Sequence, residues 1–277
     1  MVDIFWLVAG LVLILIGASK LTDGSAAIAR RMGISDLVVG LTVVAFGTSA
    51  PELVISLMAA IGGNAPMAIG NVVGSNIFNI LVIIGVTALV RPIVIEKSVM
   101  SMEIPMVILS SLVVLVLGNS AWLDGTSVNM ITRTDGIFLL IFFILFMRYT
   151  LATAKNGVEG TTETGVPVMS VTRSVIYVVA GLGALIFGGD KFVDGASGVA
   201  RVLGMSDAVI GLTIVSAGTS LPELATSVVA ALKGRPGMAV GNVIGSNIFN
   251  VVMVLGLSAV VSPLPLTIIH ISEPPRQ

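Results

Sequence analysis

Two glutamates, each directly after a proline, are the residues of this chain with the most evident chemistry. Glu52 lies in "GTSAPELVIS" at residues 47–56, and Glu223 lies in "GTSLPELATS" at residues 218–227. A proline inside a helix removes an N–H donor and clashes with the carbonyl four residues back, which loses its helical partner. Carboxylates, hydroxyls and freed carbonyls form an oxygen-rich ligand set, which suits hard cations such as Ca²⁺ and Na⁺. The two stretches therefore predict cation binding inside an interrupted helix.

A second pair of stretches adds neutral oxygen donors: "GNVVGSNIFN" at residues 70–79 and "GNVIGSNIFN" at residues 241–250. Amide and hydroxyl oxygens can coordinate a cation without adding charge, and the glycines allow two helices to approach closely. Such a stretch alone is typical of helix packing, but its duplication beside the glutamate stretches favours ligation. The candidate polar residues are Asn71, Ser75, Asn76, Asn79, Asn242, Ser246, Asn247 and Asn250.

Both pairs belong to one long internal repeat with a constant offset of 171 residues. From Gly17 to Pro92 no gap is needed, and about half of the positions are identical in the second copy. Lys20 and Asp23 return as Lys191 and Asp194, and each pair is predicted to form an ion pair near the end of a span. The chain is therefore two copies of one unit.

The composition is that of a membrane protein. Of the 277 residues 56% are hydrophobic and 10% are charged, and the mean hydropathy is +1.09, whereas a soluble domain has about 25% charged residues. The absence of cysteine excludes disulfides and thiolate metal sites. A net charge of −1 without a basic stripe argues against nucleic-acid binding. No nucleophile–base pair or metal-hydrolase motif indicates an enzyme.

Eight apolar segments are candidate membrane spans. The first one lacks a basic start and returns later in the chain, so it is not interpreted as a signal peptide. The segments are Ile4–Ala18, Leu37–Ile61, Met67–Val90, Met100–Leu117, Gly136–Leu151, Val175–Gly188, Ala208–Leu232 and Met238–Val261.

Five candidate spans separate a residue from its counterpart in the second copy. Because five is odd, the two copies must enter the membrane in opposite directions. Inverted repeats with interrupted segments at matching positions are typical of secondary transporters, whose sites lie at the repeat interface near the bilayer midplane. We therefore predict an all-α polytopic membrane protein with an inverted-repeat transporter fold. Its expected parts are a first repeat (1–151), a linker (152–173), a second repeat (174–263) and a short tail (264–277).

The distribution of Lys and Arg predicts the orientation. We call the side on which the chain starts side A and the opposite side, which holds the linker, side B. Ten basic residues fall on side B and four on side A, which predicts that side B is cytoplasmic and the N-terminus is external, in a cell (inner) membrane. Side B holds Lys20, Arg30, Arg31, Arg91, Lys97, Arg148, Lys155, Arg173, Lys233 and Arg235, and side A holds Arg133, Lys191, Arg201 and Arg276.

With both motifs identified, the chain resembles the sodium/calcium exchanger family of the cation/Ca²⁺ antiporter superfamily, in its short prokaryotic form. The resemblance runs from about Phe5 to Pro263 and rests on the paired GTS-x-PE and GN-x-x-GSN motifs, which are highly specific. It implies ten helices in two inverted halves, and exchange of Na⁺ against Ca²⁺ by alternating access at central cation sites. The substrates would be these two ions, with the lipid bilayer as surroundings, no nucleic-acid partner and no cofactor.

The resemblance also implies roles for individual residues. Glu52, Glu223, Thr48 and Thr219 match calcium ligands. Asn79 and Asn250 match a central polar pair. The positions that match sodium ligands are the side chains of Ser49, Ser220, Ser75 and Ser246 and the backbone at Ala45 and Ser216.

Two departures from the family pattern affect these expectations. Some members carry an aspartate where this chain has Asn250, and the loss of a titratable group leaves the sodium count and any proton involvement open. In addition, 14 residues follow Pro263, which at ~1.5 Å per helical residue extend about 21 Å, too short to span a bilayer. The resemblance implies ten helices, but this sequence has candidate segments for eight. We therefore expect a fragment or a truncated product that lacks the last two.

Three other functions remain open from the sequence. A proton-coupled Ca²⁺ exchanger of the same superfamily differs only in the coupling ion. A cation channel would share the polar pathway without gradient-coupled counterflow. An inactive or sensory homologue is disfavoured by the two intact motif pairs but favoured by the short tail. Neither the stoichiometry nor the oligomeric state follows from the sequence.

Overall fold

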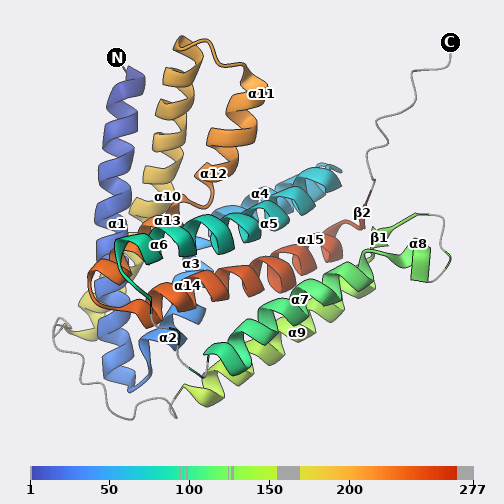
Figure 1. Cartoon of the computed structure of the whole chain (residues 1–277), viewed down its shortest axis with the longest axis horizontal. Helices are drawn as coiled ribbons and strands as arrows, with labels where there is room; N and C mark the ends of the chain where they lie inside the picture. The colour runs from blue at the N-terminus through green and yellow to red at the C-terminus, as the bar shows by residue number, and fades with distance from the viewer. Residues whose placement is uncertain are drawn as a thin grey trace.

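The computed structural model describes residues 2–93, 95, 97, 99–123, 125, 128–154 and 169–266, and these form an almost entirely helical molecule (Figure 1). The predicted inter-repeat linker falls largely outside the described residues, as does most of the tail. A single pair of two-residue strands is present in the described chain.

The first repeat contains helices whose boundaries follow its proline and glycine residues. Several of them contain a turn of π-helix, denoted η, next to a motif. The elements are α1 (Val2–Met32), α2 (Asp36–Val39), η1 (Gly40–Val44), α3 (Ala45–Thr48), α4 (Ala50–Ile61), α5 (Ala65–Phe78), η2 (Asn79–Ile83), α6 (Ile84–Val90), η3 (Val99–Glu103), α7 (Ile104–Leu117), α8 (Ser120–Leu123), β1 (Met130–Ile131) and α9 (Arg133–Thr153).

The second repeat reproduces the order of the first three helical segments. Its elements are α10 (Val171–Val202), α11 (Asp207–Ile210), η4 (Gly211–Val215), α12 (Ser216–Gly218), α13 (Leu221–Leu232), α14 (Pro236–Ile248), η5 (Phe249–Val254), α15 (Leu255–Val261) and β2 (Leu264–Pro265). Glycines with a positive φ angle, the left-handed backbone conformation, end matching helices in both repeats. Gly33 and Gly204 follow α1 and α10, and Gly63 and Gly234 follow α4 and α13.

All eight predicted segments lie in helical parts of the structure, but the helices differ from the prediction in length and continuity. Among the described residues, six continuous helices are long and apolar enough to cross a membrane, and α2–α4, with a 47° bend at its break, counts as a seventh if the bent pair is one span. The remaining predicted segment, Ala208–Leu232, is divided at residues 219–220 into shorter helices. α1 and α10, with 31 and 32 residues, extend well beyond the predicted Ile4–Ala18 and Val175–Gly188.

The equivalent helices α1 and α10 pack against each other in opposite directions. A Cβ placed on Gly10 would meet the carbonyl oxygen of Gly188 at 2.7 Å, and one on Gly17 would meet that of Gly181 at the same distance. Because the partner number falls as the α1 number rises, the helices are antiparallel. Gly10 and Gly17 are the repeat counterparts of Gly181 and Gly188, so the contact is symmetric and the second copy is inverted. In Figure 1 both helices stand at a steep angle to α5, α9 and α14.

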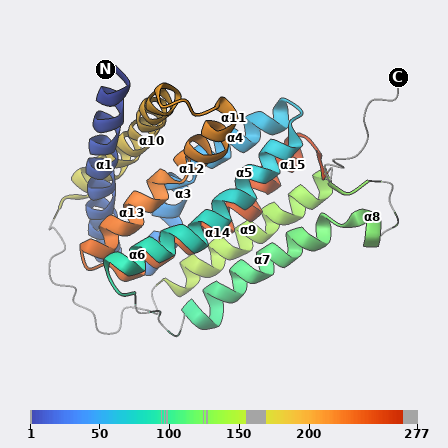
Figure 2. The same cartoon turned by 45° about the horizontal axis from the view of Figure 1, so that its top comes forward.

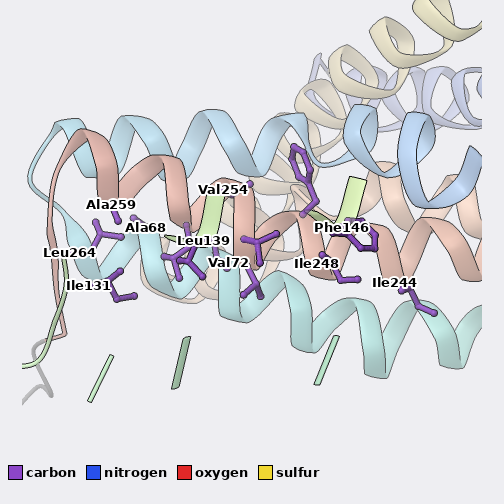
Figure 3. Packing of buried hydrophobic residues seen from close by; sticks show 14 of the residues in the cluster. Ala68, Val72, Ile131, Leu139, Phe146, Ile244, Ile248, Val254, Ala259 and Leu264 are labelled. Atoms are coloured by element: carbon purple, nitrogen blue, oxygen red, sulfur yellow. The ribbon is translucent and has the colours of Figure 1, made fainter. Parts of the chain in front are cut away.

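The continuous helix α14–α15 forms the centre of the larger hydrophobic core. Ile248, Val252 and Val254 are fully buried on it, and they pack with residues of α5 and α9 such as Val72 and Leu139 (Figure 3). Helices α7 and α9 lie side by side at the edge of this layer in both Figure 1 and Figure 2. The counterpart helix α5–α6 instead has much of its apolar surface exposed.

The strands β1 and β2 pair antiparallel, with Met130 opposite Pro265 and Ile131 opposite Leu264. Both strands belong to connections assigned to side A, so the pairing agrees with the predicted alternation of sides. No sequence pattern around residues 130–131 or 264–265 indicates this pairing.

One of the two predicted ion pairs is wrong. Lys191 Nζ lies 2.8 Å from Asp194 Oδ2, as predicted. Lys20 instead donates to the hydroxyl of Tyr177 at 3.4 Å, while Asp23 binds Lys233 of the second repeat at 2.7 Å. The two copies thus share residue types at these positions but use them for different contacts.

Candidate cation-binding site

Each glutamate lies in the first turn of the helix that follows a break. α3 ends at Thr48 and α4 begins at Ala50, and the proline lies in the first turn of α4, where a missing N–H removes no helical hydrogen bond. The second repeat has the same arrangement between α12 and α13. The breaks pack closely on α10, because a side chain at Gly47 would collide with Leu182 and one at Gly218 with Val193.

The two glutamates are fully buried and bind serines of the opposite repeat. Ser49 Oγ donates to Glu223 Oε1 at 2.8 Å, and its counterpart Ser220 Oγ donates to Glu52 Oε1 at 3.2 Å. Ser75 Oγ also donates to Glu52 Oε1, at 3.4 Å. The two break regions therefore meet at one place, where both carboxylates are removed from water.

The hydroxyls of the two motif threonines and of Ser246 differ in their partners. Thr48 and Thr219 each donate to the carbonyl oxygen three residues earlier, at 3.4 Å, and Thr48 also interacts with Asn242 Oδ1 at 3.1 Å. The buried hydroxyl of Ser246 has no hydrogen-bond partner among the described residues. The backbone carbonyls assigned from the family resemblance have local partners: Ala45 O accepts from Ser49 N at 3.0 Å, and Ser216 O accepts from the Thr219 hydroxyl at 3.4 Å.

Four asparagines connect the repeats beside the carboxylates. Asn79 Nδ2 donates to Asn247 Oδ1 and Asn250 Nδ2 donates to Asn76 Oδ1, both at 3.2 Å. Asn76 Nδ2 additionally donates to the carbonyl oxygen of Asn247 at 3.1 Å. Asn79 and Asn250 thus form a symmetric pair at the repeat interface.

Asn71 and Asn242 hold the glutamate helices in place instead of providing open ligands. Asn71 Nδ2 donates to the backbone carbonyl of Glu52 at 3.2 Å and to Ser56 Oγ at 2.9 Å. Asn242 makes the same two bonds to Glu223 and Ser227, at the same distances. The sequence places both asparagines among the candidate oxygen donors, and their positioning role depends on helix contacts that the motif alone does not reveal.

Besides the hydroxyl oxygen of Ser246, four buried acceptor oxygens of the glutamate and asparagine side chains of this site have no hydrogen-bond partner among the described residues. An unsatisfied buried acceptor is rare in proteins and costs about 1–3 kcal/mol, and more when it is charged. A bound cation would satisfy such oxygens. They form two repeat-related pairs: Glu52 Oε2 with Glu223 Oε2, and Asn79 Oδ1 with Asn250 Oδ1.

The site carries a formal charge of −2 from two carboxylates. Within the described part of the chain no group of three or more His, Cys, Asp or Glu side chains forms a conventional metal site. The remaining donors are hydroxyl and amide oxygens, which agrees with the hard-cation chemistry predicted from the sequence.

The packing around the site is closed toward side B. A Cβ on Gly40 of η1 would meet the carbonyl oxygen of Met238 at 2.5 Å, and a Cβ on Gly245 would meet Leu41 Cα at 2.8 Å. Helix α14 and the segment α2–η1 therefore touch along their backbones. The half of the site that holds Gly40 and Gly245 is therefore tightly packed.

The equivalent contact toward side A is absent from the described chain. The counterpart glycines Gly211 of η4 and Gly70 and Gly74 of α5 have no described atom within 4 Å of an added Cβ. Instead, α11 lies beside α10 (Figure 1). The two halves of the site thus differ in packing although their motifs are nearly identical.

The chain is similar to known membrane proteins over most of its length. The model of the family "Sodium/calcium exchanger protein" matches residues 2–152 and 173–274. The inner membrane protein YrbG of Escherichia coli K12 is 36% identical over 270 residues, covering 93% of this chain and 79% of YrbG. The sodium/calcium exchanger MaX1 of Methanosarcina acetivorans is 32% identical over 294 residues, covering 95% of this chain and 84% of MaX1.

A solved structure of the sodium-calcium exchanger NCX_Mj, soaked with 2.5 mM Na⁺ and 0.1 mM Ca²⁺, has the same architecture. Its TM-score to this chain is 0.81 at 32% sequence identity, covering 96% of this chain and 84% of NCX_Mj. The agreement in fold and sequence over almost the full length identifies a multi-pass membrane transport protein of the cation/Ca²⁺ antiporter type, and not an enzyme. This chain belongs to the sodium/calcium exchanger family.

Proposed function

We propose that this protein exchanges Na⁺ for Ca²⁺ across the membrane by alternating access. The observation that carries the proposal is the reciprocal binding of two fully buried glutamates: Ser49 of the first repeat binds Glu223, and Ser220 of the second binds Glu52. Two carboxylates in one dry site repel each other and are costly to bury unless a cation offsets their charge. One Ca²⁺ or two Na⁺ would neutralise them, so the two ions compete for the same charge.

The proposed ligands follow the symmetry of the site. Glu52, Glu223, Thr48 and Thr219 would bind Ca²⁺. Asn79 and Asn250 would add neutral amide oxygens between the repeats. Na⁺ would use the hydroxyls of Ser49, Ser220, Ser75 and Ser246 and the carbonyls of Ala45 and Ser216, which can each accept a second interaction.

The unequal packing of the two halves supports alternating access. Gly40 is in tight contact with α14, while its counterpart Gly211 has open space around it. Two copies of one unit that share their motifs but pack in two ways are what a transporter needs to exchange a closed side and an open side. In this conformation the path from side A would be the open one.

The coupling ion is tested by measuring ⁴⁵Ca²⁺ uptake into proteoliposomes. We expect an outward Na⁺ gradient to drive saturable uptake, and a pH gradient at equal Na⁺ to drive none. The expectation of Na⁺ coupling takes into account that Asn250 is uncharged and cannot carry a proton. The carboxylates of the described central site are therefore those of Glu52 and Glu223. Uptake driven by the pH gradient would show that protons are the coupling ion. Uptake that does not saturate and needs no counter-ion would indicate a channel.

The proposed topology places the linker on the cytoplasmic face of the cell membrane, between a first repeat at 1–151 and a second at 174–263. A cysteine at Asn156, which lies outside the described residues, should react with a membrane-impermeant maleimide only after the cells are opened. The chain has no native cysteine, so the background is low. Reaction in intact cells would reverse the orientation.

A further inference from the structure

Three basic residues on side B bind elements on the far side of the repeat interface. Lys233 and Arg235 lie in the connection between α13 and α14, and Arg91 follows α6. Their partners lie on α1, at the start of α2 and at the end of α13. We call Lys233, Arg235 and Arg91, together with Asp23 and Asp36, the side-B latch.

Lys233 connects the α13–α14 connection to α1. Its Nζ lies 2.7 Å from Asp23 Oδ1, 2.8 Å from Ser19 Oγ and 3.0 Å from the carbonyl oxygen of Ser19. Both charged side chains are less than one-third exposed. This contact joins the second repeat to the long helix that lies next to α2.

Arg235 connects the same loop to the beginning of α2. It is 4% exposed, and its Nη1 lies 3.5 Å from Asp36 Oδ2, which is an ion pair without a hydrogen bond between these two atoms. A buried guanidinium is strongly destabilising without a carboxylate partner. Separating α2 from α14 would remove that partner, so the pair favours the closed packing of α2–η1.

Arg91, which follows α6, binds the end of α13. Its Nη1 donates to the carbonyl oxygens of Ala231 and Leu232, at 3.3 and 3.4 Å. These carbonyls lie in the last turn of α13, where a cation also interacts favourably with the helix dipole. α6 is thereby tied to the end of the helix that carries Glu223.

The repeat symmetry is broken at all three basic positions. Their counterparts 171 residues away are neutral, namely Gly62, Asn64 and Ser262. On side A the cation Lys191 binds Asp190 at 2.9 Å and Asp194 at 2.8 Å, both on its own helix. In the described chain, basic side chains at the closed side therefore connect the two repeats. Their neutral counterparts at the open side cannot form ion pairs.

We propose that the side-B latch holds side B closed and makes the conformation open to side A the more stable one. The inference rests on the proposed alternating access between a state open to side A and a state open to side B. The ion ligands are nearly symmetric in the two repeats, so the side-B latch would be what makes the energies of these two states unequal. Opening side B requires these ion pairs to break, and the neutral counterpart residues Gly62, Asn64 and Ser262 cannot replace them in the opposite state. The protein would therefore rest with its site accessible from side A.

The test uses single cysteines as reporters of each side. Leu41 is 4% exposed in the η1–α14 contact on side B, whereas Ser216 on α12, in the half without the equivalent contact, is exposed. Leu41→Cys and Ser216→Cys are made separately in the otherwise cysteine-free chain. The rate of reaction with a small water-soluble maleimide is measured on the purified protein without transport, so a failed latch is distinguishable from a failed exchanger.

We expect Lys233→Asp or Asp23→Lys to raise the reaction rate at Leu41→Cys about fivefold and to lower that at Ser216→Cys, because the population shifts between two states. The double variant Lys233→Asp/Asp23→Lys should return both rates to within about twofold of the starting protein. Arg31→Gln, an exposed neutralisation at the same end of α1, serves as the control and should change neither rate.

General loosening of the fold would raise the rate at both reporters and would overturn the proposal. Unchanged rates in both single variants would overturn it as well, as would a double variant that reacts as fast as the singles. If charge reversal prevents folding, Lys233→Gln and Arg235→Gln give the same test, with the same opposite changes expected at the two reporters.

Discussion

Glu52→Gln or Glu223→Gln should abolish measurable calcium exchange, and the two losses should be similar. Each substitution keeps the shape of the side chain but removes half of the −2 charge that faces the ion. At an effective dielectric of about 20, one unit charge at contact distance is worth several kcal/mol, and ~1.4 kcal/mol is tenfold in affinity. We therefore expect a loss of at least about a hundredfold in Na⁺-driven ⁴⁵Ca²⁺ uptake.

The matched control is Glu103→Gln. Glu103 is also a buried glutamate, but it lies in η3 and has no counterpart in the motif of the second repeat. This variant should keep its exchange activity. Near-normal uptake by either Glu52→Gln or Glu223→Gln would overturn the site assignment. Loss in all three variants would indicate a general effect on folding.

Gly70→Ala and Gly241→Ala should both block exchange, by at least about tenfold, but for opposite reasons. A Cβ on Gly241 would collide with the backbone carbonyl of Leu37, so this variant disfavours the observed contact on side B. A Cβ on Gly70 meets no described atom within 4 Å, so this variant leaves the observed conformation intact. If side A closes by the same packing in the other half of the cycle, the same methyl group would then prevent that closure.

Thermal unfolding separates the two effects. Gly70→Ala should unfold at the temperature of the unmodified protein, and Gly241→Ala should unfold at a lower one. Gly85→Ala provides a control on the continuous helix α5–α6, which also holds Gly70. Gly85 likewise has open space around it, but it lies outside the GN-x-x-GSN motif. Full exchange activity of Gly70→Ala would contradict a symmetric closure of side A.

The duplicated motifs explain why much of the site could be predicted from the sequence. Because "GTS-x-PE" and "GN-x-x-GSN" occur twice, Glu52 and Glu223 stand out from a background of apolar helices, and the odd span count gives the inversion. The antiparallel packing of α1 on α10 agrees with that prediction. A hydrophobic pattern also suffices to locate all eight helical segments.

The remaining features depend on tertiary contacts that no local pattern encodes. Asn71 and Asn242 could be ligands by type, and only their bonds to the neighbouring glutamate helices show that they position them. Asp23 binds Lys233, which is 210 residues away, in preference to its neighbour Lys20. The closed and open halves carry the same motifs, so the motifs alone do not predict which half is tightly packed.

Equilibrium ⁴⁵Ca²⁺ binding to the purified protein tests most directly whether the two repeats share one calcium site. We predict one Ca²⁺ per chain, displaced competitively by Na⁺ and lost in either Glu52→Gln or Glu223→Gln, because both carboxylates meet at the repeat interface. Two Ca²⁺ per chain, with one retained in each single variant, would contradict this account, since each repeat would then hold a site of its own.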